Sequence, residues 1–221
     1  MKILVIAPHM DDEVLGMGGT IARHVSEEDE VYVCFIAHRI YDHKFNDEKN
    51  KIEVQCALKA KKVLGYKEAE FFNLNDERLD VSIQDILIPL EQYVNKIKPE
   101  TVYVTHRGDN HQDHRAVFQA AMIALRPFAN LGIKKILSYE TPSSTEQSPN
   151  LSELAFLPNF YINIEKYLET KIKALRCYQT EKRDFPHPRS DKSVEILAIK
   201  RGTEVGFKAA EAFVVIRDKW N

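Results

Sequence analysis

Runs of hydrophobic residues alternate along the chain with segments whose apolar positions recur at helical spacing. Lys2 to Ala7 is an unbroken apolar run rich in β-branched residues, which predicts a strand buried on both faces. Val14 to His24 places its apolar residues on one face of a helix. The same reasoning predicts strands at 2–7, 31–37, 70–74, 101–105, 134–139, 159–164 and 213–216, and helices at 14–24, 52–64, 81–97, 116–125, 167–178 and 194–201.

Strands that alternate with helices favour an α/β fold: a Rossmann-like, doubly wound, mainly parallel sheet with helices on both faces. Pro89 is expected to bend or split the helix that contains it. The charged and aromatic segment 41–50 predicts a mobile loop over the cleft. The segment 140–158 predicts a long irregular loop, whose place after a strand favours substrate contact. No repeat or linker divides the chain, so residues 1–221 are expected to form a single domain.

The composition is that of an ordinary globular protein. The chain has 221 residues, of which 44% are hydrophobic and 29% charged, and its net charge is −2. This charge gives no electrostatic reason to expect binding to nucleic acid or to a membrane. The three widely spaced cysteines predict buried thiols in a reducing compartment rather than disulfides. Because no signal peptide or membrane-spanning apolar run is apparent, a cytoplasmic location is expected.

The densest cluster of ionisable residues follows the first predicted strand, in the segment Pro-His-Met-Asp-Asp-Glu at 8–13. Open α/β sheets place their active sites at the carboxyl ends of strands. Three consecutive carboxylates raise one another's pKa, and a cation among them removes this penalty. His9 and one Asp of the turn can face the same ion, with the second Asp beside it. Acidic residues at a helix start also match the helix dipole, so this cluster alone is ambiguous.

A second cluster, His-Arg-Gly-Asp-Asn-His-Gln-Asp-His at 106–114, follows the predicted strand 101–105. His111 and His114 are three residues apart and can lie on one face at a helix start. Histidine pairs at this spacing are common on protein surfaces, so the pair alone is weak evidence. Both clusters follow strands and are therefore expected at one edge of a parallel sheet. A shared metal ion is the simplest reason for them to meet.

The two motifs resemble the A-H-P-D-D-E and H-x-D-H signatures of the PIG-L/LmbE-like zinc-dependent N-deacetylases, and the resemblance covers nearly the whole chain. It implies metal ligands at His9, Asp12 and His114, with a fourth position left for water. The implied cofactor is Zn²⁺, although the same ligands accept other divalent ions. One departure is Pro8-His9-Met10 in place of Ala-His-Pro, which loses a proline but keeps every chemical group.

The same resemblance implies catalytic roles for three further residues. Asp11 would be the general base, and His111 would support the oxyanion and protonate the leaving amine. Asp113 would orient or tune a neighbouring histidine, and it is the nearest carboxylate to support a charge on His111. Some relatives carry Asn at the position of His111, which leaves His106 and His187 as alternative general acids.

Five residues are candidates for substrate binding. Arginine and serine on a proline-rich loop can hold a phosphate or a sugar hydroxyl. The alternative is that 186–189 forms a structural corner in which the arginine pairs with a carboxylate. The candidates are Arg107, Tyr139, His187, Arg189 and Ser190.

Gly16, Gly18 and Gly19 lie within a predicted helix rather than in the turn before it. That turn is acidic and would repel phosphate, so a dinucleotide site is rejected. These glycines are expected to allow close packing of the helix instead.

Taken together, the motifs imply a Zn²⁺-dependent hydrolase that removes acetyl from an N-acetylglucosamine-type sugar or glycoconjugate. One alternative is hydrolysis of a non-sugar N-acyl substrate at the same centre. Another is a sugar-binding relative that keeps the metal without turnover. The expected partner is a small N-acetylated sugar, and because relatives often form trimers or hexamers the resemblance also allows a homo-oligomer.

Overall fold

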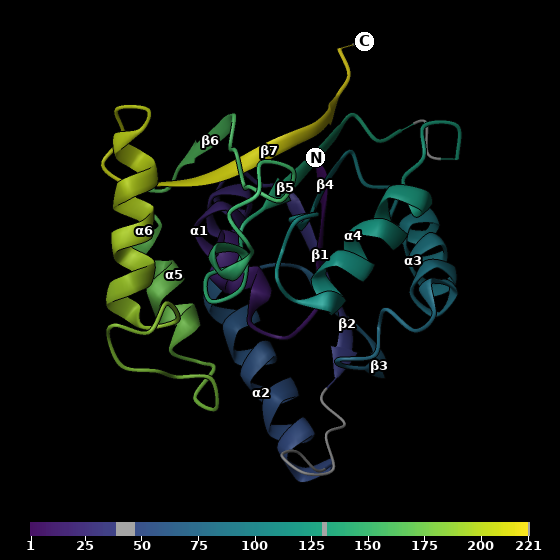
Figure 1. Ribbon diagram of the computed structural model, residues 1–221, viewed down its shortest axis with the longest axis horizontal. Coiled ribbons are helices and arrows are strands. Elements are labelled where there is room, and N and C mark those ends of the chain that lie inside the picture. The colour runs from purple at the N-terminus through teal and green to yellow at the C-terminus, as the bar shows by residue number, and fades with distance from the viewer. Residues whose placement is uncertain (39–46, 130–131, 221) are drawn as a thin grey trace.

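The computed structural model describes residues 1–38, 47–129 and 132–220, which form a seven-stranded sheet covered by helices (Figure 1). The strands are β1 (Lys2–Ala7), β2 (Glu30–His38), β3 (Glu68–Asn75), β4 (Thr101–Thr105), β5 (Lys135–Tyr139), β6 (Phe160–Asn163) and β7 (Ala210–Asp218). The helices are α1 (Asp12–Ser26), α2 (Asp47–Leu64), α3 (Ile83–Ile97), α4 (Gln112–Ala124), α5 (Leu168–Leu175) and α6 (Asp191–Thr203), with a short 3₁₀ helix, η1 (Thr145–Gln147).

The sheet has the strand order β3-β2-β1-β4-β5-β7-β6. The first five strands run parallel, whereas β7 runs antiparallel to both of its neighbours. The expected α/β fold with a mainly parallel sheet is therefore confirmed. The order reverses between β1 and β4, and such a switch point is where doubly wound sheets bind their ligands.

Helices cover both faces of the sheet (Figure 1). The side chains of β1 alternate between the two resulting cores, because successive residues of a strand point to opposite faces. Ile3 and Val5 pack beneath α1, α2 and α5, while Leu4 and Ile6 pack beneath α3 and α4. All four are fully buried, and each contributes about 1.5–3 kcal/mol to stability. The unbroken apolar run in the sequence is thus explained by burial on both faces.

Helix α1 is broken at Met17, whose backbone (φ −151°, ψ 26°) is not helical, although the sequence predicts a continuous helix here. A buried ion pair occupies the break. Lys171 Nζ donates to the Leu15 carbonyl and, at 2.6 Å, to the carboxylate of Glu211. That carboxylate in turn accepts from the amides of residues 19 and 20. The pair therefore satisfies backbone groups that the break would otherwise leave without partners.

Two glycines of α1 allow its close approach to neighbouring side chains. A Cβ added to Gly16 would lie 2.3 Å from the ring of Tyr139, and one added to Gly19 would lie 2.8 Å from Ile164. Both distances are too short for real carbon contacts. The expectation that these glycines serve packing is confirmed.

Several elements differ from the sequence-based expectations. Helix α3 continues through Pro89 without being split, and α4 begins at Gln112 instead of 116, which makes His111 its N-cap. Of the predicted loop 41–50, residues 41–46 lie outside the described residues, and 47–50 belong to α2. None of the helices in the described ranges combines the length and apolarity needed to cross a membrane.

Candidate metal centre and active site

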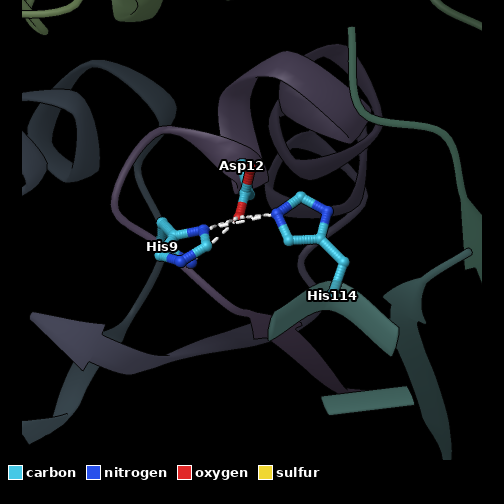
Figure 2. Close-up of side chains that lie close together, drawn as sticks. All are labelled: His9, Asp12 and His114. Atoms are coloured by element: carbon cyan, nitrogen blue, oxygen red, sulfur yellow. Dashed lines mark hydrogen bonds and ion pairs between the residues drawn. The ribbon is translucent and has the colours of Figure 1, made fainter. Parts of the chain in front are cut away.

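The two motifs meet at the carboxyl ends of β1 and β4, which are paired in parallel. The chain leaves β1 through a short turn and enters α1 at Asp12, and it leaves β4 through a longer turn and enters α4 at Gln112. Because the strands are neighbours, these turns bring His9 and Asp12 to face His114 (Figure 2).

His9, Asp12 and His114 present three ligand atoms to one point. His9 Nδ1 lies 3.4 Å from Asp12 Oδ2, His114 Nε2 lies 3.2 Å from the same oxygen, and the two nitrogens are 3.3 Å apart. In tetrahedral zinc sites with bonds of about 2.0–2.1 Å, neighbouring ligand atoms are about 3.3–3.4 Å apart. Two imidazoles and one carboxylate in this arrangement fit a divalent metal ion with a fourth position open.

Carboxylates behind the ligands fix the orientation of both imidazoles. Asp113 Oδ2 lies 2.9 Å from His9 Nε2, and Asp109 Oδ2 lies 3.2 Å from His114 Nδ1. Both carboxylates are buried. Metal-ligating histidines usually donate their second ring N–H to such a partner, which makes the ring a better ligand.

Contacts between opposite charges shift the pKa values of the residues in this buried cluster. Burial by itself lowers the pKa of His114, but the carboxylates of Asp12 and Asp109 outweigh it and raise that pKa to about 10. Burial similarly opposes protonation of His9, but contacts with Asp113 and Asp12 raise its pKa. For Asp12, burial is outweighed by the two imidazoles, which hold its pKa well below the usual range. A metal ion held by these candidate ligands would therefore compete with protons.

Asp11 lies beside the three ligands and is only 1% exposed. Its backbone has φ 116°, in the left-handed region that costs a non-glycine residue roughly 1–3 kcal/mol. The Asp11 amide donates to the carboxylate of Glu13, which also accepts from the Tyr178 hydroxyl. Arg189 Nη1 lies 2.9 Å from Asp11 Oδ2. The surroundings thus hold both the backbone and the carboxylate of this residue.

His111 lines the space in front of the ligands, with its ring centre 4.7 Å from that of His9. Burial, followed by the nearby rings of His9 and His114, lowers the pKa of His111 to about 4. Its Nδ1 accepts from the Asp113 amide, so Nε2 carries the hydrogen of the neutral ring. The Asp113 carboxylate bonds to His9, and it also lies close enough to His111 for its charge to oppose the lowering of the His111 pKa.

A cavity of about 430 Å³ opens over this centre. Every lining residue in the described part of the chain carries a polar or charged side chain. Three come from the loop 140–158, which was expected to contact substrate. The lining consists of His9, Asp11, Asp76, Glu77, His111, His114, Ser143, Ser144, Gln147, Thr180, Glu181, Arg183, His187 and Arg189.

Three of the five residues predicted to bind substrate lie outside the lining of this cavity, and each has a polar group bonded elsewhere in the fold. Tyr139 is fully buried and its hydroxyl donates to a carbonyl of β1. Ser190 is the N-cap of α6 and accepts from the Ser193 amide. Arg107 donates to the backbone carbonyl of Glu153. None of the three lines the cavity.

The remaining candidates have different positions. His187 lines the cavity and stays a candidate for the general acid or a substrate contact. His106 does not line the cavity, and its Nε2 lies 2.9 Å from the Leu154 carbonyl oxygen. Arg189 lines the cavity and pairs with Asp11 and with Glu181, as in the alternative of a structural corner.

Two functional candidates escape the sequence reasoning. Asp109 supports a ligand from within the turn before α4, and Glu181 shares the guanidinium of Arg189 from the loop after α5. Asp109 belongs to the second motif, but several other polar residues of that motif are equally plausible partners for the ring of His114. Nothing in the spacing points to Glu181.

The chain belongs to the PIG-L family, described as GlcNAc-PI de-N-acetylase, which matches residues 4–125. It is 30% identical over 184 residues to the Uncharacterized deacetylase YaiS of Escherichia coli strain K12, covering 80% of this chain and 90% of that protein. The residues matched by the family model contain both motifs. The match supports a hydrolytic N-deacetylase.

Solved structures show the same fold. N,N'-diacetylchitobiose deacetylase from Pyrococcus horikoshii superposes with a TM-score of 0.78 at 22% identity, covering 98% of this chain and 84% of that one. GalB, the 4-carboxy-2-hydroxymuconate hydratase of Pseudomonas putida KT2440, superposes with a TM-score of 0.75 at 19% identity, covering 100% and 98%. Since these two enzymes differ in reaction, the fold alone does not fix the chemistry.

Proposed function

We propose that this protein is a Zn²⁺-dependent N-deacetylase that hydrolyses the acetamide of an N-acetylated sugar or glycoconjugate, of the N-acetylglucosamine type. The observation that carries the proposal is the triangle of His9, Asp12 and His114, with edges of 3.2–3.4 Å, beside the carboxylate of Asp11. Membership of the PIG-L family supports hydrolysis over the hydration performed by GalB.

The ligands His9, Asp12 and His114 would hold the metal, which in such sites polarises the carbonyl and lowers the pKa of water towards about 7. Asp11 takes a proton from the attacking water. His111 lines the cavity, and its Nε2–H would donate to the oxygen that becomes negative as the carbonyl is attacked. One such donor contributes about 3–4 kcal/mol to transition-state stabilisation.

The leaving amine needs a proton for the C–N bond to break. The proton that Asp11 removes from water balances the one that the amine receives. Either Asp11 itself or an imidazolium at His111, as the family resemblance implies, delivers this proton. His187 is a further candidate donor at the cavity wall.

The lining of the cavity supports a hydroxyl-rich substrate. All the described lining side chains can donate or accept hydrogen bonds, which suits sugar hydroxyls. A relative from Thermococcus kodakarensis, 21% identical, is named diacetylchitobiose deacetylase. A non-sugar amide at the same centre is the second candidate, and a sugar-binding protein without turnover is the third.

The substitution Asp11→Asn tests the proposal. It removes the base and leaves all three ligands, so zinc content should stay at the wild-type level while acetate release falls by about 10²–10⁴-fold. Acetate is measured with N-acetylglucosamine, N,N'-diacetylchitobiose and UDP-N-acetylglucosamine as substrates. Full activity of the variant would contradict the role of Asp11, and zinc binding without acetate release from the wild type would favour the silent relative or a non-sugar substrate.

A further inference from the structure

Arg189 connects three segments at the cavity wall. Its Nη1 donates to Asp11 Oδ2 at 2.9 Å and to Glu181 Oε2 at 2.7 Å, while Nε donates to Ser143 Oγ at 2.6 Å. These partners come from the turn after β1, the loop after α5 and the loop after β5. A guanidinium has several donors in a fixed plane, so one side chain can hold all three segments in register.

The arginine is itself held in place. Its backbone amide donates to His187 Nδ1, and the next residue, Ser190, is the N-cap of α6. Its side chain is only 22% exposed. Because both its backbone and its guanidinium are bonded to the protein, Arg189 has little freedom to turn towards a substrate.

Asp11 requires such support. Its carboxylate is followed in the chain by the carboxylates of Asp12 and Glu13, and all three are buried. The guanidinium offsets the repulsion between Asp11 and Asp12, and it occupies Asp11 Oδ2, which restrains rotation of the Asp11 carboxylate about its Cβ–Cγ bond.

We propose that Arg189 is a positioning residue that acts through Asp11, and that Glu181 and Ser143 keep the guanidinium aimed at that carboxylate. The inference rests on the proposed function, because Asp11 is the base of that reaction. It differs from a substrate-binding role in its kinetic consequence. A residue that aims the base affects kcat, whereas a residue that holds the substrate equally in the ground and transition states affects KM.

The test compares Arg189→Ala and Arg189→Lys with wild type in the zinc-loaded protein, using the best substrate among the three N-acetylated sugars named above. We expect kcat of the alanine variant to fall by about 10²-fold, with KM within about threefold of wild type and zinc content unchanged. Millimolar guanidinium chloride should restore part of kcat to Arg189→Ala and none to Asp11→Asn. The lysine variant keeps a cation and should retain an intermediate kcat. If the alanine variant does not fold, the lysine variant tests the positioning role in its place.

Two further variants complete the design. In the Asp11→Asn background, Arg189→Ala should reduce kcat by no more than about twofold, because residues that act as a unit are not additive. Arg176→Gln is the matched control: this arginine pairs with Asp191 in an exposed position, and its loss should leave kcat and KM unchanged.

The outcomes separate the two proposals. A raised KM with unchanged kcat, or the same factor of loss in both backgrounds, would overturn the positioning role and make Arg189 a substrate contact. An inactive wild type would overturn the proposed function and the role of Arg189 with it.

Discussion

Two cavities of about 430 Å³ each lie at opposite ends of the parallel strands, at the carboxyl edge and the amino edge of the sheet, and their linings differ in chemistry. The cavity at the carboxyl edge has only polar and charged residues among its described lining. The one at the amino edge includes Leu137 and Phe160 together with several charged residues. Several of these charges form pairs, as in Lys134 with Glu100 and Lys135 with Asp218. Volume alone therefore does not distinguish a reactive site from a hollow in the surface.

Both edges also bring histidine and carboxylates together. At the amino edge, ligand atoms of His24, Glu27 and Asp29 lie within 4.8 Å of one another. The Asp29 carboxylate already binds His24 Nδ1 and the amino terminus, and His24 Nε2 bonds to the Tyr103 hydroxyl. At the carboxyl edge the atoms of His9, Asp12 and His114 converge on one point while other carboxylates support them from behind. The candidate metal centre is therefore distinguished by ligand atoms that face one point and by carboxylates that hold the histidines, and closeness alone is not sufficient.

The largest predicted effect separates the two histidine clusters. His114→Gln removes a ligand and should abolish zinc binding and reduce acetate release by at least about 10³-fold, since both the metal and its effect on water are lost. His24→Gln is the matched change at the other edge and should leave both unchanged. Metal analysis of the purified variants and the acetate assay measure these effects. Loss of zinc from His24→Gln would contradict the assignment of the metal to the cluster that contains His114.

A second prediction concerns the ion pair in the break of α1. Lys171→Met leaves the Glu211 carboxylate buried without its cation and should lower the free energy of unfolding by about 3–5 kcal/mol. Lys134→Met removes an exposed pair at the amino edge and should cost less than about 1 kcal/mol. Chemical denaturation measures both. Equal losses would mean that burial does not distinguish these two ion pairs.

A smaller effect is predicted for Asp113, which lies behind the candidate metal centre. Asp113→Asn removes the carboxylate that orients His9 and should weaken zinc binding by about 10–100-fold while keeping all three ligands. Saturating zinc should then restore most of the activity, unlike in His114→Gln. Competition with a chelator of known affinity gives the binding constant, and an unchanged constant would remove Asp113 from the site.

The sequence predicts well wherever neighbouring residues determine the structure. The bounds of β1 and β4 agree with the predicted 2–7 and 101–105, because both strands are buried and consist mostly of β-branched and aromatic residues. The meeting of the two motifs also follows from local features, since two strand ends in a parallel sheet share an edge.

The sequence predicts poorly where distant residues decide. The break in α1 depends on Lys171 and Glu211, which lie far along the chain and occupy positions of ordinary charge. Tyr139 seemed able to contact substrate, but the missing Cβ of Gly16 opens a space that its ring fills. Arg189 contacts Asp11 across 178 positions of sequence, and no local spacing reveals that pair.

The central claim is that His9, Asp12 and His114 bind a catalytic divalent metal. The most direct measurement is metal content coupled to acetate release from the N-acetylated sugars, before and after chelation. The account predicts about one zinc ion per chain, acetate release that a chelator stops, and recovery on adding zinc. A protein that binds no divalent metal even with zinc in excess, or whose acetate release is indifferent to complete metal removal, would contradict it.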